Sequence, residues 1–381
     1  MISLLVIFIF SFFTAYLFFP QLIKFLNSKK LIDKPDKRKI HNRPKPSMGG
    51  VLFLPVALVG LLFFYNGGDL LAKDFYLIFS CFLVLCLGFL DDVMNLRARH
   101  KLLFFFPAIM IAIFGAGIKL TSFHGLFWIG DISHFSGVIL TVFTIVSITN
   151  AYNLIDGIDG LAACIGIIAC SILGILLYFQ GFHLHAMLLW GIAGATLAFL
   201  FFNWAPSKIF MGDTGSLLLG FLITVSLIRF IENNHASSAQ FLVFKNPISF
   251  AISLIVLPFF DTIRVFTIRI LNGRSPFDPD KNHMHHLLLK LGFDHALTRT
   301  ILVCSTLCFM SLAVAFSNWS DNSYFYWMFL MGGCASIYLH YLSHSYSYSK
   351  KRQLVQLRKQ DKQVSEERVY SELNTEKVVA P

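Results

Sequence analysis

Runs of roughly 17–25 predominantly apolar residues follow one another along almost the whole chain, separated by short polar segments. A run of this length crosses the hydrocarbon core of a bilayer as a helix, and only helices or closed barrels satisfy their backbone polar groups there. Charged residues make up 14% of the 381 residues, whereas an average globular protein has about 25%. The sequence therefore predicts an all-α polytopic membrane protein without a separate soluble domain.

We expect about eleven transmembrane helices from the lengths of these runs. They lie near residues 2–26, 49–66, 74–90, 102–118, 136–151, 160–179, 184–203, 214–231, 247–269, 300–317 and 324–342. The first run lacks a basic start and a small-residue cleavage site, so we interpret it as a retained span rather than a signal peptide.

The distribution of basic residues predicts how these spans are oriented. Of the 31 Lys and Arg, only Lys73, Lys119, Arg229 and Lys245 fall on one side of the predicted topology. Because cytoplasmic loops carry an excess of Lys and Arg, we expect the amino terminus outside and the carboxyl terminus in the cytoplasm.

The chain changes character near its end. Residues 1–345 form the predicted membrane domain, and residues 346–381 form a charged cytoplasmic tail that we expect to be disordered. The tail begins with a basic stretch over residues 350–362, which fits either simple topological anchoring or contact with anionic lipids.

Aspartates stand at the ends of several apolar runs, at positions 91, 92, 156, 159, 213 and 261. A charged side chain at the bilayer centre costs about 2.5–3.5 kcal/mol on insertion scales, so acids in such segments indicate function. The predicted topology puts all of them at the cytoplasmic edge, on the side of the basic loops. Accidents of helix boundaries would scatter over both faces, so we expect these acids to form one site.

Several carboxylates at one site repel each other, because two unit charges 4 Å apart cost about 4 kcal/mol at an effective dielectric constant of 20. They stay ionised together only with a compensating cation. Zinc prefers Cys and His ligands, but the seven cysteines all lie within predicted spans and form no CxxC pattern. Carboxylates, a carboxamide and water suit Mg²⁺, which also binds substrate phosphates. The adjacent basic loops favour a phosphate-bearing substrate.

Glycines border two of these acids, in Gly157–Gly160 around Asp159 and in Gly212–Gly215 around Asp213. Glycine permits positive φ and a close approach of backbone N–H groups to an anion at a helix start. An ordinary turn with an aspartate N-cap is the alternative for each segment alone. Their repetition at one predicted face favours a shared anion site.

Two further cytoplasmic segments are unusual. Pro46–Gly50 ends a basic loop and shapes a tight entrance to the second span, although the basic residues before it could serve topology alone. His283, His285 and His286 follow a proline-containing segment and precede a short helix that could lie in the interface. This cluster could be polar residues at a loop end, a zinc site, a binding site for phosphate or sugar, or an active-site scaffold.

Taken together, the chain resembles the bacterial polyprenyl-phosphate N-acetylhexosamine-1-phosphate transferases. The resemblance covers roughly residues 1–345 and rests on blocks in family order and spacing. These blocks are Pro46–Gly50, Asp91–Asp92, Asn150–Gly160, Phe210–Ser216 and His283–His286. Ser275–His286 is similar to the branch that transfers amino-sugar phosphates. It is less like the muramoyl-pentapeptide branch, whose three histidines are consecutive, whereas Met284 interrupts them here.

The resemblance implies transfer of a sugar 1-phosphate, most simply N-acetylglucosamine 1-phosphate, from a UDP-sugar to undecaprenyl phosphate with release of UMP. It implies a multi-pass protein of the bacterial inner membrane with its active site at the cytoplasmic face. It also implies a Mg²⁺ cofactor, for which Mn²⁺ can substitute, held by Asn153 and Asp213. We expect no nucleic-acid partner, and a homodimer stays open.

By resemblance, the residues expected to take part in catalysis are Asp91, Asp92, Asp156, Asp159 and His283. Those expected to bind substrate are Ser47, Phe210, Gly212, Arg269, Arg274, Asp280, His285 and His286. Phe210 matches the family aromatic that stacks on uracil, and Asp156 and Asp159 would contact the nucleoside or surround the metal ligands. Asp91 and Asp92 correspond to a base and a phosphate positioner. A phosphate monoester is already largely dianionic at pH 7, so we favour an orienting role for this pair.

The main alternative is the same chemistry on another donor, such as UDP-GalNAc, a UDP-linked deoxy-amino sugar or UDP-MurNAc-pentapeptide. A secondary transporter would need acids near the bilayer midplane and broken helices, whereas these acids lie at one edge. A binding protein that has lost catalysis would need a missing block, and none of the blocks is missing.

Overall fold

The computed structural model describes residues 1–33, 45–65, 72–204, 206–239, 242–275 and 283–346. The long helices of the first half are α1 (Ile2–Ser28), α3 (Ala72–Met94), α5 (His134–Leu154), α6 (Leu161–Phe179) and α7 (His183–Asn203). Shorter elements there are η1 (Gly49–Leu52), α2 (Phe53–Phe64), α4 (Ala98–Met110), η2 (Ile111–Gly115) and η3 (Leu126–Trp128). Two short strands, β1 (Ile32–Asp33) and β2 (Lys45–Pro46), pair antiparallel.

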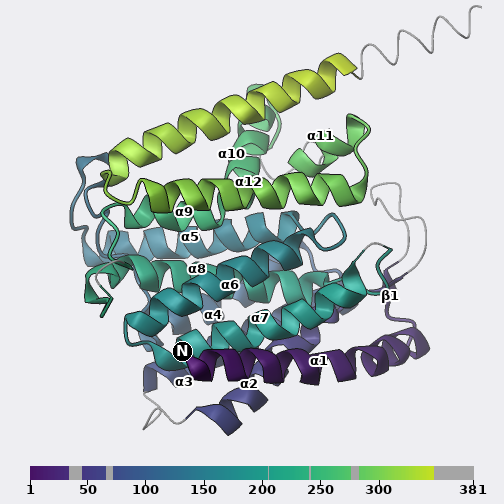
Figure 1. The fold of residues 1–381 in the computed structure, drawn as a ribbon. Coiled ribbons are helices and arrows are strands. Elements are labelled where there is room, and N and C mark those ends of the chain that lie inside the picture. Colours follow the sequence, from purple (N-terminus) through teal and green to yellow (C-terminus); the bar gives the residue numbers. More distant parts are fainter. Residues whose placement is uncertain (34–44, 66–71, 205, 240–241, 276–282, 347–381) are drawn as a thin grey trace, which may run out of the picture.

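The second half contains α8 (Gly212–Glu232), η4 (Asn234–Ala236), α9 (Pro247–Leu254), α10 (Val256–Leu271), α11 (Met284–Lys290) and α12 (His295–Ala315). A last helix covers residues 321–346. Helices run side by side across the view of Figure 1, with α1 and α2 toward the bottom and the last helix at the top. The prediction of an all-α polytopic membrane protein is therefore confirmed in its fold class.

Helix α8 lies at the centre of the bundle. It packs against α3, α5 and α6, and its most apolar 18-residue window is 100% buried. In the outer helix α1, only 28% of an apolar 18-residue stretch is buried. Ile2 and Leu17 of this helix are exposed. Apolar side chains both inside and outside the bundle are expected for helices surrounded by lipid, where water does not select a polar outer surface.

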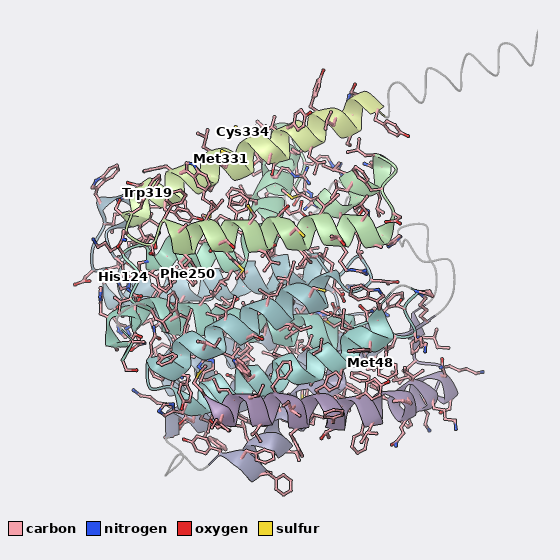
Figure 2. The ribbon with its side chains drawn as sticks, viewed as in Figure 1. Met48, His124, Phe250, Trp319, Met331 and Cys334 are labelled. Carbon is pink, nitrogen blue, oxygen red and sulfur yellow. The ribbon has the colours of Figure 1, made fainter. Side chains whose placement is uncertain are left out.

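The two ends of the bundle carry different polar contacts. Met48 lies at one end of the view in Figure 2, and His124 and Trp319 lie at the other. At the His124 end, Asn322 joins two segments by accepting a hydrogen bond from Phe127 N (2.7 Å) and donating one to Gly125 O (2.8 Å). The acids predicted to converge lie at the Met48 end, as the contacts described below establish.

A helix occurs at each of the predicted spans, but not all are equally long. By length and composition, the described residues contain 8 helices able to cross a membrane, or up to 9 with one bent pair. Residues 247–269, predicted as one span, form α9 and α10, which are bent by 85°. Pro258 lies in the first turn of α10 and has no N–H to bond the carbonyl of Leu254, which favours a break of the helix at Ile255.

Close contact between α3 and α8 depends on Gly88. A Cβ at this position would lie 2.5 Å from Thr214 Cα and 2.6 Å from Asp213 O. We therefore expect Gly88→Ala to lower the free energy of unfolding by about 1–3 kcal/mol, because backbone atoms must move apart. Thermal unfolding of the detergent-solubilised chain measures this.

Gly333→Ala is the matched control, because nothing lies within 4 Å of a Cβ there in the helix over residues 321–346. It should leave stability unchanged or raise it by about 0.5–1 kcal/mol. Equal unfolding temperatures for the two variants would show that α3 and α8 are not in close contact.

Candidate active site

The carboxylate of Asp92 holds the start of α8. Its Oδ1 accepts a hydrogen bond from Asp213 N (2.8 Å), and its Oδ2 accepts from Thr214 N (2.9 Å) and from the Thr214 hydroxyl. These amides are among the donors that a helix start leaves without intrahelical partners. Gly212 precedes them with φ of 74°, and a Cβ there would lie 2.5 Å from Asp92 Oδ2. Asp92 on α3 thus fixes the position of Asp213 on α8.

Asp91 and Asp213 share a lysine. Lys101 Nζ lies 2.6 Å from Asp91 Oδ2 and 3.2 Å from Asp213 Oδ2. The other oxygen of Asp91 accepts a hydrogen bond from Leu96 N (2.8 Å). Two acids from different helices therefore meet at one point, where positive charge is required to hold them together.

Asn153 completes this cluster from the end of α5. Its amide group donates hydrogen bonds to Asp213 Oδ1 and to Ser216 Oγ (2.7 Å). Rotation of the carboxamide by half a turn would present its oxygen, rather than its nitrogen, beside the Asp213 carboxylate. The Asp213 side chain is 32% exposed, which leaves it open to ligands from solution.

These donors fit Mg²⁺ as one or two protein oxygens, with substrate phosphates and water supplying the rest of the coordination. Among the described residues, no three His, Cys, Asp or Glu side chains form a metal site on their own. A complete protein cage for the metal is therefore not found in this part of the chain. The donor chemistry agrees with a hard cation bound together with its substrate.

The loop between α5 and α6 brings a second pair of acids. Burial, together with the nearby charges of Asp213, Asp92 and Asp159, raises the pKa of Asp156 well above its usual range. Asp159 faces β2, where Lys45 Nζ lies 4.0 Å from its Oδ2. Asp156 therefore lies near enough to Asp213 and Asp92 to sense their charges, and Asp159 lies beside Lys45.

Two hydrogen bonds fix this acidic loop. Asn203 Oδ1 accepts a hydrogen bond from Gly160 N (2.7 Å), and Asp159 O accepts one from Arg299 Nη1 (2.9 Å). The Arg299 guanidinium carbon also lies 3.6 Å from the ring centroid of Trp204. The loop is thus held from α7 and from α12.

The segments Pro46–Gly50 and Phe210–Ser216 lie against each other. Phe210 N donates to Pro46 O (2.9 Å), and Gly49 N donates to Phe210 O (2.9 Å). Lys45 Nζ donates to Ser207 Oγ (2.8 Å) and lies 5.1 Å from the centroid of the Phe210 ring. The structure therefore places a lysine beside the aromatic ring expected to stack on uracil.

The histidine segment approaches the acidic loop through His285. The His283 and His285 rings are stacked at an interplanar angle of 7° with centroids 5.8 Å apart. A Cβ on Gly157 would lie 2.7 Å from His285 Nε2, so the loop and this ring are in direct contact. Burial, with His286 nearby, lowers the pKa of His285 to about 3, so its ring is neutral at pH 7.

The other residues expected to bind substrate belong to further segments. Arg269 is buried on α10, and Arg274 follows the end of that helix, where its N–H donates to Arg269 O (2.9 Å). Ser47 lies between Pro46 and Met48, beside the Phe210 segment. Asp280 lies outside the described residues, as does the predicted tail beyond residue 346.

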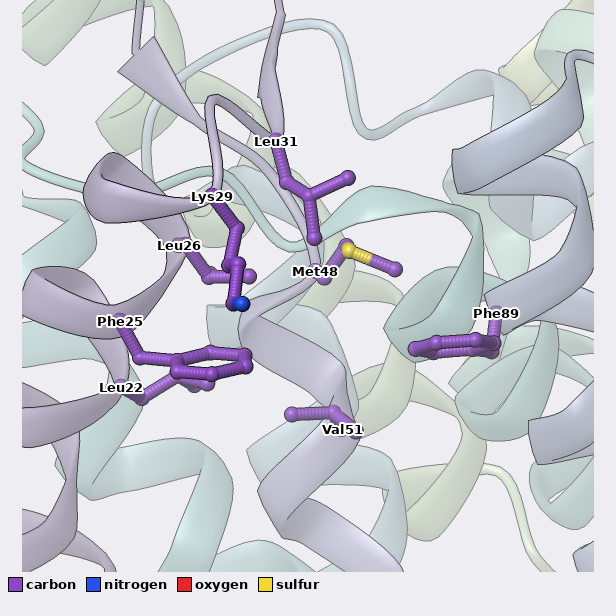
Figure 3. A pocket seen from close by; sticks show the side chains of 8 residues that line it. All are labelled: Leu22, Phe25, Leu26, Lys29, Leu31, Met48, Val51 and Phe89. Carbon is purple, nitrogen blue, oxygen red and sulfur yellow. The ribbon is translucent and has the colours of Figure 1, made fainter.

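An apolar crevice opens next to this site. It has a volume of ≈ 420 Å³ and is lined by Leu22, Phe25, Leu26, Lys29, Leu31, Met48, Val51 and Phe89. Figure 3 shows Lys29 and Met48 on opposite sides of the Leu31 side chain. With one charged residue in its wall, the crevice suits an apolar chain rather than a sugar nucleotide.

The sequence is similar to those of several known proteins. The chain is 34% identical over 306 residues to a probable undecaprenyl-phosphate N-acetylglucosaminyl 1-phosphate transferase of Bacillus subtilis (strain 168), covering 79% of this chain and 82% of that protein. The sequence model of glycosyl transferase family 4 matches residues 75–231. This chain belongs to glycosyl transferase family 4.

Other members of family 4 are similar over most of their length. The undecaprenyl-phosphate alpha-N-acetylglucosaminyl 1-phosphate transferase of Escherichia coli O157:H7 is 30% identical over 295 residues, 75% of this chain and 76% of that protein. The decaprenyl-phosphate N-acetylglucosaminephosphotransferase of Mycolicibacterium smegmatis is 30% identical over 285 residues, 68% of this chain and 69% of that protein. The family resemblance predicted from the sequence blocks is confirmed.

The sequence alone did not single out three basic residues of this candidate site. Lys101 and Lys45 were counted only as charges in cytoplasmic loops, and Arg299 was counted in the same way. The signal that could have singled out Lys101 is its place shortly after Asp91 and Asp92, across one turn between two helices. Lys45 directly precedes Pro46, which is a similar signal. Nothing local distinguishes Arg299.

Proposed function

We propose that this chain transfers N-acetylglucosamine 1-phosphate from UDP-N-acetylglucosamine to undecaprenyl phosphate and releases UMP. The observation that carries the proposal is the convergence of Lys101 and Asn153 on Asp213, with Asp91 paired to the same lysine and the acidic loop of Asp156 and Asp159 nearby. Such a cluster suits a cation and a pyrophosphate. The names of the family 4 relatives supply the sugar and the polyprenyl phosphate.

In this reaction an oxygen of the acceptor phosphate attacks the phosphorus that carries the sugar. A new P–O–P bond forms, the bond to the UMP phosphate breaks, and UMP leaves with the bonding electron pair. The acceptor monoester has a second pKa near 6, so much of it is already dianionic at pH 7 and needs no base. Positioning and charge neutralisation then supply most of the catalysis in phosphoryl transfer.

Mg²⁺ is part of this proposal, with Asn153 and Asp213 as the residues that would hold it. When bound, the ion neutralises negative charge on the pyrophosphate. Lys101 adds a second positive charge at the same place, 3.2 Å from Asp213. Asp92 keeps Asp213 in position through the start of α8.

We place the active site at the cytoplasmic face of a bacterial inner membrane, with the amino terminus outside. Lys45, Lys101 and Arg299 all contact the candidate site, at the end of the bundle where the basic loops lie. This arrangement agrees with the excess of Lys and Arg in cytoplasmic loops. A sugar nucleotide from the cytoplasm and a lipid phosphate from the inner leaflet can meet at such an edge.

Release of UMP tests the function directly. Purified chain in detergent should release UMP from UDP-N-acetylglucosamine only when undecaprenyl phosphate is present, and EDTA should abolish release until Mg²⁺ is restored. A panel containing UDP-GalNAc and UDP-MurNAc-pentapeptide identifies the donor. Metal-independent activity would remove the Mg²⁺ assignment, and no product with any donor would favour a transporter or an inactive binding protein.

A further inference from the structure

Asp261 is a buried acid of α10 with no role assigned so far. It is 2% exposed and lies after the break between α9 and α10, facing the histidine segment. Its Oδ1 accepts hydrogen bonds from Arg264 Nη2 (2.9 Å) and Met284 N (2.8 Å), and its Oδ2 lies 2.9 Å from His283 Nδ1. Both carboxylate oxygens are therefore engaged.

We propose that Asp261 is a positioning residue that aligns His283 and the start of α11 with the acidic loop of the active site. The proposal rests on the proposed function, because it concerns the alignment of that same site. Asp261 itself would touch neither substrate nor metal. It acts through His283 and through the backbone of Met284.

The hydrogen bond to His283 fixes the state of its ring. A carboxylate only accepts, so Nδ1 carries the proton in this pair, and the ring presents Nε2 on its other side. His283 is 6% exposed, which leaves its ring little freedom to turn. The acid thus selects both the orientation and the tautomer of the first histidine in the segment.

The hydrogen bond to Met284 fixes the backbone. His283 is the N-cap residue of α11, and its side chain makes no capping hydrogen bond. Asp261 Oδ1 instead takes up the first N–H of that helix. Asp261 on α10 therefore caps the start of α11, as Asp92 on α3 caps the start of α8.

The alignment extends from His283 to the acidic loop. The His283 ring stacks on the His285 ring, and the His285 ring lies against Gly157. Gly157 directly follows Asp156 and lies two residues before Asp159. A change in the angle of α11 would consequently move the ring that contacts this loop.

Asp261→Asn is the informative variant because it keeps the size of the side chain. The oxygen of asparagine can still accept hydrogen bonds from Arg264 Nη2 and Met284 N. Its NH₂ group would then face His283 Nδ1. The ring must give up that proton to accept the new hydrogen bond, which places a proton on Nε2 instead. We expect kcat to fall on the order of 100-fold, as misplacement of catalytic groups by about 1 Å can cause.

Asp321→Asn is the matched control. Asp321 is 3% exposed, and its Oδ1 accepts a hydrogen bond from Ser249 N (2.8 Å) at the start of α9, toward the other end of the bundle. It is thus another buried aspartate that caps a helix in a different part of the chain. We expect its kcat to stay within about 3-fold of the parent under conditions where both variants remain folded.

Two measurements on the full-length chain decide the proposal. Steady-state kinetics with UDP-N-acetylglucosamine and undecaprenyl phosphate separate kcat from KM. Hydrogen–deuterium exchange over residues 283–290 follows the hydrogen bond to Met284, and Asp261→Ala should speed exchange there while α8 stays protected. Faster exchange throughout the protein would indicate general unfolding and contradict a local role.

The proposal is overturned if Asp261→Asn keeps parental kcat, or if Asp321→Asn loses as much activity. It is also overturned if exchange over residues 283–290 is unchanged in Asp261→Ala. Parental chain that releases no UMP would instead refute the proposed function. In that case the exchange experiment still tests whether Asp261 holds the histidine segment.

Discussion

Asp213→Asn is expected to lower kcat by on the order of 10³-fold or more, because it removes the charge on which Lys101, Asn153 and the proposed Mg²⁺ converge. The protein should still fold and insert. Asp92, not the Asp213 side chain, holds the start of α8, and the Asp213 side chain is about a third exposed. Steady-state release of UMP across a Mg²⁺ titration measures the effect.

Asp131→Asn is the control for this experiment. Asp131 is exposed and its backbone pairs with that of Ser122, toward the His124 end of the bundle. It should retain the parental rate. If Asp213→Asn kept its rate and its Mg²⁺ dependence, Asp213 could not be the metal ligand. Loss of activity accompanied by loss of the folded protein in detergent would show that its role is structural.

Asp92→Asn is expected to lower activity on the order of 100-fold at every pH from about 6 to about 9. Both carboxylate oxygens accept hydrogen bonds, so the NH₂ group of asparagine must face a backbone N–H of either Asp213 or Thr214. One buried donor then loses its partner, which costs about 1–3 kcal/mol and shifts the start of α8. Rate–pH profiles and thermal unfolding measure the two effects.

Asp294→Asn is the matched control for Asp92. Asp294 caps α12, and its side chain accepts a hydrogen bond from Leu297 N (2.7 Å) through Oδ1, an oxygen that asparagine retains, so asparagine can cap equally well. We expect little change in rate or stability. Recovery of the Asp92→Asn rate at high pH would contradict the orienting role. It would mean that undecaprenyl phosphate reacts without the Asp92 carboxylate once solvent has removed its proton, so that Asp92 acts as a base.

The two helix starts at this site follow one physical scheme. An aspartate from a neighbouring helix accepts the first N–H groups of α8, and another does so for α11. Each acid thereby positions a residue of the candidate site, Asp213, which is expected to hold the metal, and His283, which is expected to take part in catalysis. The first contact joins helices whose residues lie 121 positions apart in the chain, whereas the second joins the consecutive helices α10 and α11.

The sequence by itself determined the class of fold and the family. Runs of apolar residues specify helices through their length alone, and the blocks from Pro46 to His286 can be compared one by one with a family pattern. The grouping of the acids at one end followed from the order of the spans. Each of these properties is local or depends only on position along the chain.

The tertiary structure decided which of these residues act on one another. Lys101 pairs with Asp213, which is 112 residues away, and Asp92 accepts a hydrogen bond from Asp213 N, 121 residues later, at the start of α8. The 85° bend before α10 turns Asp261 toward His283. Hydrogen bonds depend on distances of about 3 Å and on the direction of each side chain. Helix packing sets those quantities, and the spacing of residues along the chain does not contain them.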